Sequence, residues 1–159
     1  MQPLIDKITG DMKKAEASTN KLYLVCPICR MEPFIARNFG DGYFYTAPAS
    51  VFQLDPATVK ALKETITKNS ISELVWVGNS DCCFIHNVLD KTASGLNCEN
   101  TICSLHAEGD TEVSLIQKLM KDQIARLKNT KVFGKEIARG ELRLTSIIAS
   151  KHSREVIPA

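Results

Sequence analysis

The chain contains two short runs of consecutive apolar residues, and they constrain its fold more than any other feature. The first is Leu22–Cys26 and the second is Leu74–Gly78. Continuous apolar runs are typical of strands buried on both faces, as in parallel sheets covered by helices. The first run ends on a cysteine, with Cys29 three residues later, and Cys82 and Cys83 follow the second. Because α/β proteins build sites at the carboxyl ends of parallel strands, these thiols could meet and hold a metal such as zinc.

The spacing of apolar residues and the positions of capping residues divide the rest of the chain into helices and strands. Strands are expected over residues 21–26, 43–46, 73–78 and 141–149. Helices are expected over 2–19, 31–38, 55–69, 81–90 and 111–128, with a further short segment over 130–139. Residues 91–110 are polar and are expected to form a long loop. Alternating strands and helices predict an α/β fold, a mostly parallel β-sheet flanked by helices. The length predicts that residues 1–159 form a single domain.

The composition narrows the classes of partner. The net charge is only +2 among 159 residues, which argues against nucleic acid and against a membrane surface as partners. The N-terminus has neither a basic nor an apolar segment of the kind found in signal peptides, so we expect a cytoplasmic protein. In a reducing compartment the six cysteines stay as thiols. Cys98 and Cys103 fall in the expected loop, and no role is assigned to them.

Three segments, taken in order, resemble the β-class carbonic anhydrases. Cys26–Arg30 stands where that family has Cys-x-Asp-x-Arg. Gly40–Ala49 stands where it has Gly-Asp followed by a strand and Arg-Asn-Ala-Gly. Gly78–Cys83 stands where it has Gly-His-(Ser/Thr)-x-Cys-Gly. The resemblance covers about residues 20–150. It implies the fold of that family, a zinc site, hydration of carbon dioxide, and a homodimer or higher even oligomer in which the N-terminal helix, residues 1–19, packs on a partner subunit.

The departures from the family pattern fall on the residues that carry the chemistry. The resemblance assigns Cys26 and Cys82 as metal ligands, but Asn79 stands where the family has its histidine ligand. Ile28 replaces the aspartate that accepts a hydrogen bond from zinc-bound hydroxide, and Arg30 remains as the partner of that lost aspartate. An amide oxygen is a poorer zinc ligand than imidazole, and an aliphatic side chain cannot orient hydroxide. The sequence therefore predicts impaired or absent carbon dioxide hydration.

The third metal ligand and the function are left open by the sequence. Candidates for that ligand are Asn79, Cys29, Cys83 and His86, and an alternative is that no zinc binds. Three functions remain: a carbonic-anhydrase-like protein with a degenerate site, an active divergent zinc lyase or hydrolase, and a non-catalytic dimeric module that binds or senses a small molecule or anion. Asp81 and Asp41 are the carboxylates that could replace the one lost at Ile28.

Overall fold

The computed structural model describes residues 20–152 and 156–158, and within them five strands form one sheet in the order β2-β1-β3-β4-β5. The strands are β1 (Lys21–Val25), β2 (Tyr43–Thr46), β3 (Glu73–Asn79), β4 (Arg143–Ala149) and β5 (Val156–Pro158). The first four are parallel and β5 is antiparallel to β4. The α/β class and the four expected strands are confirmed, whereas β5 was not expected. The helix expected over 2–19 lies outside the described residues.

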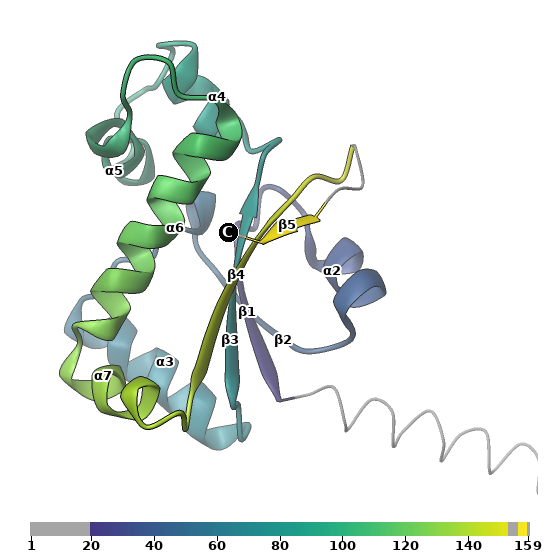
Figure 1. Cartoon of the computed structure of the whole chain (residues 1–159), viewed down its shortest axis with the longest axis vertical. Coiled ribbons are helices and arrows are strands. Elements are labelled where there is room, and N and C mark those ends of the chain that lie inside the picture. Colours follow the sequence, from purple (N-terminus) through teal and green to yellow (C-terminus); the bar gives the residue numbers. More distant parts are fainter. Residues whose placement is uncertain (1–19, 153–155, 159) are drawn as a thin grey trace, which may run out of the picture.

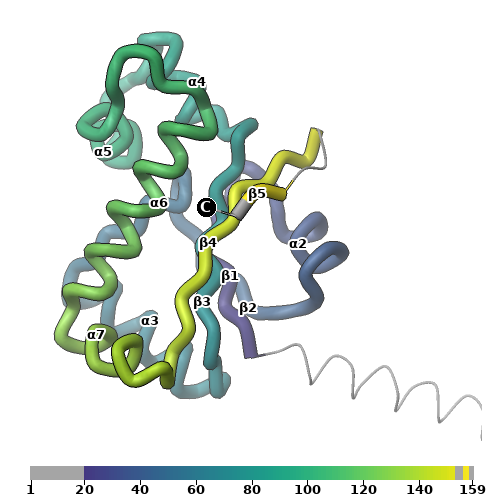
Figure 2. The backbone as a smooth tube through the Cα atoms, viewed as in Figure 1, coloured from purple at the N-terminus to yellow at the C-terminus, as the bar shows by residue number. Residues whose placement is uncertain are grey.

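Helices cover both faces of this sheet (Figures 1 and 2). They are α2 (Glu32–Phe39), the 3-10 turn η1 (Pro48–Ser50), α3 (Pro56–Lys68), α4 (Cys83–Leu89), α5 (Asn97–Leu105), α6 (Glu112–Lys128) and α7 (Lys131–Ala138). Figure 1 shows α2 on one side of the sheet and α3 to α7 on the other. No helix among the described residues is long and apolar enough to cross a membrane.

The alternation of side chains along the strands separates two cores. Tyr23 and Val25 of β1 pack in the smaller core, which includes Ile35 of α2. Leu24 and Cys26 point the other way, into the larger core that α3 to α7 cover. Successive side chains of a strand point to opposite faces. The strand end therefore delivers the Cys26 sulfur to the face covered by five helices.

The expectation of a loop over residues 91–110 is wrong, because α5 occupies its middle. Cys98 and Ile102, one helical turn apart, are buried in the larger core. The polar Glu99 is also fully buried, and its carboxylate accepts from the backbone N–H groups of Ser94 and Leu96. A glutamate that satisfies the amides ahead of a helix belongs to its cap. The polar composition of this segment thus reflects a capped helix.

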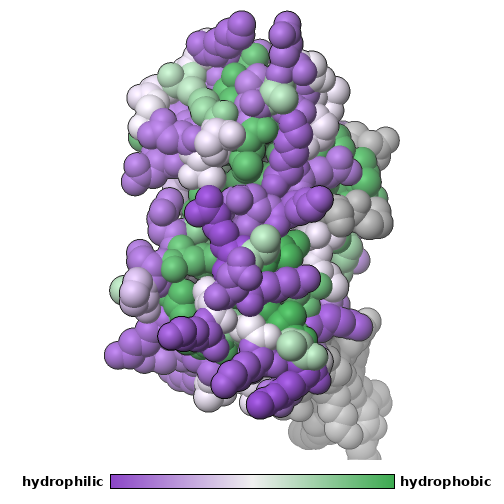
Figure 3. All heavy atoms as spheres, turned by 60° about the vertical axis from the view of Figure 1, so that its left-hand side comes forward, coloured by the Kyte–Doolittle hydropathy of each residue, from purple (hydrophilic) through white to green (hydrophobic). Residues whose placement is uncertain are grey.

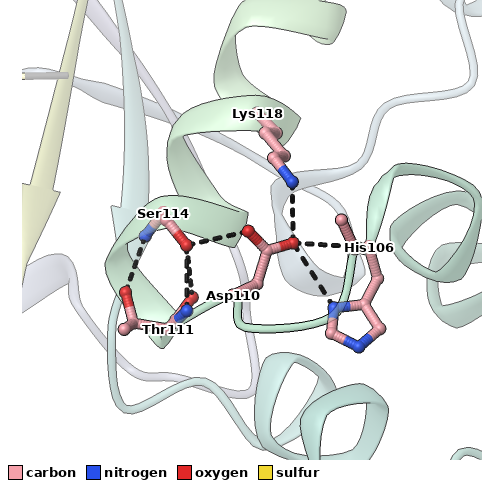
Figure 4. Close-up of polar contacts among 6 residues, drawn as sticks. His106, Asp110, Thr111, Ser114 and Lys118 are labelled. Atoms are coloured by element: carbon pink, nitrogen blue, oxygen red, sulfur yellow. Dashed lines mark hydrogen bonds and ion pairs between the residues drawn. The ribbon is translucent and has the colours of Figure 1, made fainter.

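A charged cluster joins α5 to α6 (Figure 4). The Asp110 carboxylate accepts a hydrogen bond from Lys118 at 2.8 Å and from the backbone N–H of Ala107 at 2.8 Å, and it lies 3.4 Å from His106 Nδ1. The Lys118 ammonium group, followed by the Ala107 amide, lowers the pKa of Asp110 below its usual range. Hydrophilic side chains cover much of the molecular face shown in Figure 3, with smaller hydrophobic patches between them.

Candidate metal centre

Three cysteine sulfurs meet at the carboxyl ends of β1 and β3. The Sγ atoms of Cys26, Cys29 and Cys82 all lie within 4.8 Å of one another. Cys26 follows β1 directly, Cys29 lies in the turn after it, and Cys82 caps the amino end of α4. Cys26 and Cys82 are buried and Cys29 is partly buried. The cluster could therefore bind a metal ion, and thiolate sulfur suits zinc and other borderline or soft ions.

Hydrogen bonds among the three thiols shift their pKa values in opposite directions. Hydrogen bonds from Cys29 and Cys82 lower the pKa of Cys26 to about 2. The same contact with Cys26 raises the pKa of Cys29 to about 11. Hydrogen bonds with Cys26 and Cys29, together with burial, raise the pKa of Cys82. These contacts favour the thiolate form of Cys26 over those of Cys29 and Cys82, and a metal ion that binds all three would have to displace the protons of the latter two.

Asn79, the last residue of β3, contacts this cluster with its side-chain amide. Its Oδ1 accepts a hydrogen bond from the backbone N–H of Asp81 at 3.0 Å. Its side chain also hydrogen-bonds to Cys29 and lowers the pKa of that thiol, which the amide Nδ2 does by donating to sulfur. An amide that donates a hydrogen bond to a thiolate can stabilise and orient it without itself binding a metal.

A strained turn supplies a second donor to the cluster. Ala49 and Ser50 both adopt left-handed backbone conformations, with φ of 57° and 58°. The backbone N–H of Ala49 donates to Cys26 and lowers the pKa of its thiol. The turn is fastened to β3, because Ser50 Oγ donates to the Val77 carbonyl at 2.8 Å and Trp76 Nε1 donates to the Ser50 carbonyl at 2.9 Å. Non-glycine residues persist in this conformation only where the surroundings hold them.

The cavity around the sulfurs is very small. Its volume is about 10 Å³. Its wall comprises the three cysteines with Ala49, Ser50, Gly78, Asn79, Ile85, Ile116, Leu119 and Met120. Apart from the cysteines, Met120 of α6 is the sulfur-bearing residue in this wall, and sequence reasoning missed it because α6 lies far along the chain. Ala49 was also missed, since no glycine or asparagine marks the turn.

The remaining candidates from the sequence, which are His86, Cys83, Ile28 and Arg30, do not line the sulfur cavity. His86 is 42% exposed, and its Nε2 lies 3.1 Å from the Ser80 carbonyl. Cys83 is exposed at the start of α4. Ile28 is 57% exposed, and it lines, with Cys29, Asn79, Cys83 and Asp81, a neighbouring cavity of about 180 Å³. Arg30 is exposed and does not line the sulfur cavity.

Comparisons with known proteins bear on the fold. No protein-family model matches the chain, and no curated protein matches it. Among solved structures, a tetrameric β-carbonic anhydrase from Sordaria macrospora is 15% identical with a TM-score of 0.69, over 99% of this chain and 90% of that one. A Coccomyxa β-carbonic anhydrase in complex with acetazolamide is 16% identical with a TM-score of 0.69, over 99% of this chain and 82% of that one.

A third solved structure carries a different activity in its name. It is the apo form of a carbon disulfide hydrolase, 11% identical with a TM-score of 0.53, over 99% of this chain and 91% of that one. At these identities the likeness concerns the backbone and says nothing of the reaction. The order of motifs along the sequence and the structural neighbours agree, and the chain has the fold of the β-carbonic anhydrases.

Proposed function

We propose that this protein is a zinc-binding relative of the β-carbonic anhydrases in which Cys26, Cys29 and Cys82 hold the metal, and that it does not hydrate carbon dioxide efficiently. The observation that carries the proposal is the meeting of three sulfurs within 4.8 Å in a cavity of about 10 Å³. In this arrangement Cys29 takes the part of the missing histidine. Three protein ligands leave the fourth position of a tetrahedral zinc open, so the case against hydration rests on the small space around the sulfurs and on the missing aspartate.

The size of the cavity argues against a bound water that could react. A cavity needs roughly 10–15 Å³ to hold one water molecule. The space among the sulfurs is about that of a single water. An ion placed there leaves no room for both hydroxide and carbon dioxide, and metal-assisted hydration requires both. Met120 of α6 forms part of the wall of this space.

Within residues 20–152 and 156–158, no carboxylate lines the sulfur cavity. Ile28 stands at the family's aspartate position and is mostly exposed. Asp81 accepts a hydrogen bond from Ser150 Oγ at 2.6 Å, which ties it to the turn after β4. Asp41 is exposed and does not line the sulfur cavity. The geometry therefore supports metal binding better than hydration.

Metal analysis of the purified chain tests the proposal. We expect about one zinc per chain, a large loss in Cys29→Ser, and no loss in Cys103→Ser, which alters an exposed cysteine of α5. Less than about one zinc per two chains in the unaltered protein would overturn the metal assignment. A stopped-flow hydration assay on zinc-loaded protein tests the second part, and rapid hydration would contradict it.

A second candidate is an active divergent lyase or hydrolase acting on a small linear substrate. The apolar wall of the sulfur cavity and the carbon disulfide hydrolase among the structural neighbours favour it. A double variant, Ile28→Asp with Asn79→His, restores the family's residues at both positions. If the scaffold supports hydration, the zinc-loaded double variant should gain activity over the unaltered chain, and activity already present without these changes would favour this candidate.

The proposed assembly is a homodimer or a higher even oligomer in the cytoplasm. Tyr43 on edge strand β2 and Val156 and Ile157 on edge strand β5 are 37%, 39% and 38% exposed. Exposed apolar residues on sheet edges favour pairing with another chain. The Sordaria macrospora neighbour is described as tetrameric. Sedimentation velocity tests this, and a monomer at all concentrations would contradict both this assembly and the alternative of a dimeric sensing module.

A further inference from the structure

Three cations from separate parts of the sequence converge on one groove outside the metal centre. Arg30, Arg37 and Lys151 line a cavity of about 470 Å³, whose wall is completed by Pro33, Phe34 and Asn38. They come from the turn after β1, from α2 and from the turn after β4. Figure 1 shows α2 and the turn after β4 on the same side of the sheet. The fold therefore brings together three positive charges that come from separate segments of the chain.

These cations lack acidic partners within the described part of the chain. Lys118, Arg126 and Arg143 each pair with a carboxylate, but none of the three groove cations does so among residues 20–152 and 156–158. Like charges that share a groove repel one another, and a bound anion would relieve that repulsion. The chain as a whole has a net charge of only +2, so the concentration of charge is local.

One residue of the groove has an unfavourable backbone conformation. Arg30 has a φ of 50°, a left-handed conformation that non-glycine residues seldom adopt. Lys151 Nζ donates to the Arg30 carbonyl at 3.4 Å, which links the ends of β1 and β4. Strained positions of this kind cluster at ligand sites, where the surrounding structure holds them.

The chemistry of the wall indicates the ligand. A guanidinium group binds two oxygens of a phosphate at once, and two arginines with a lysine suit a dianion. Phe34 and Pro33 add an apolar surface for an organic part of the ligand. The volume of the groove falls within the range of small-molecule sites. The groove lies near the carboxyl ends of the parallel strands, where α/β proteins bind ligands. We propose that this groove binds a small organic phosphate monoester.

This site is distinct from the metal centre, although Arg30 follows Cys29 directly and Lys151 lines a small cavity with Cys29 and Asn79. Among the described residues, none lines both the groove and the sulfur cavity. Phosphate binding should therefore persist in Cys29→Ser, whether or not zinc is lost. A failure of either proposal leaves the other unchanged.

Isothermal titration of the full chain with phenyl phosphate tests the inference. We expect saturable binding at one site per chain, at least about tenfold weaker in Arg37→Gln and in Lys151→Gln, since each removes a charge-assisted hydrogen bond. Lys68→Gln is the matched control. It removes one exposed positive charge in the last turn of α3, which leads into the amino end of β3.

Two further probes separate the parts of the ligand. Inorganic phosphate should bind more weakly than phenyl phosphate, and phenol should not bind. Absence of saturable phenyl phosphate binding would overturn the proposal, as would equal weakening in Lys68→Gln, which would indicate attraction to general positive charge. Equal affinity for inorganic phosphate and phenyl phosphate would overturn the assignment of an organic ligand.

Discussion

The side chain of Asn79 hydrogen-bonds to Cys29, the residue that we propose as the third metal ligand. The Asn79 oxygen is already engaged by the backbone N–H of Asp81 at 3.0 Å. These two contacts fix which end of the amide faces the sulfur. Asn79 and Cys29 therefore act together in the proposed centre.

Replacement of Asn79 by alanine should weaken zinc binding about 10- to 100-fold, because the Cys29 thiolate loses a donor from outside the metal's own ligands. Competition with a chromophoric chelator measures the effect. Asn38→Ala, which alters an exposed asparagine of α2, is the control and should not change the affinity. An unchanged affinity in Asn79→Ala would mean that its contact with Cys29 does not support the metal ligand.

Zinc binding at neutral pH should release about two protons, because Cys26 is already a thiolate while the pKa values of Cys29 and Cys82 are raised. The zinc association constant should consequently rise with pH, by about 100-fold per unit while both thiols remain protonated in the free protein. Titration calorimetry in buffers of different ionisation enthalpy counts the protons. A release of three would show that Cys26 is also a thiol before zinc binds, contrary to the geometry of the cluster.

Gly78 lies in the wall of the sulfur cavity, where a Cβ atom would collide with Ile116 Cγ2 and lie 3.6 Å from Met120 Cε. Gly78→Ala should therefore lower the free energy of unfolding by about 1–3 kcal/mol through overpacking. Urea denaturation measures the loss. In a double-mutant cycle with Ile116→Ala, part of the loss should be recovered, and strict additivity would show that these two residues do not collide.

Asp110 should contribute stability that depends on pH. Its pKa is lowered in the folded chain, so the contribution is present above the unfolded value of about 3.9 and is lost as the pH falls through the lower folded value. Asp110→Asn should lower the melting temperature at pH 7, and the difference from the unaltered chain should shrink below about pH 4. Glu108→Gln, which changes an exposed residue of the same connection, is the control. A difference that persists unchanged at low pH would assign the effect to packing.

The four parallel strands and two of the three sulfurs could be predicted from the sequence, whereas strand β5 could not. Leu22–Cys26 and Leu74–Gly78 are apolar at every position, and only strands covered on both faces tolerate this. Parallel pairing of β1 with β3 then places Cys26 and Cys82 near one edge of the sheet. Patterns of this kind depend on local sequence and on general rules of connection, so a single chain reveals them.

The third sulfur could only be named as one of several candidates. Whether Cys29 faces the cluster depends on the turn after β1, in which Arg30 adopts a left-handed conformation. Because Arg30 is not a glycine, the sequence does not indicate this conformation. The left-handed turn at Ala49 and Ser50 could not be predicted for the same reason. Met120 reaches the cavity through the packing of α6 on the sheet, which a local pattern does not encode. Cys98 was expected in a loop because its neighbours in the sequence are polar. The helix α5 buries only Cys98, Glu99 and Ile102, which is too short a pattern to indicate a helix.

X-ray absorption at the zinc edge of the zinc-loaded chain tests the central claim most directly, since it reports the ligands of the bound metal. The three-cysteine centre predicts at least three sulfur atoms at about 2.3 Å. Cys29→Ser should remove one of these sulfurs, whereas Cys103→Ser should leave the spectrum unchanged. A first shell with two sulfurs and additional nitrogen or oxygen ligands in the unaltered protein would contradict the account.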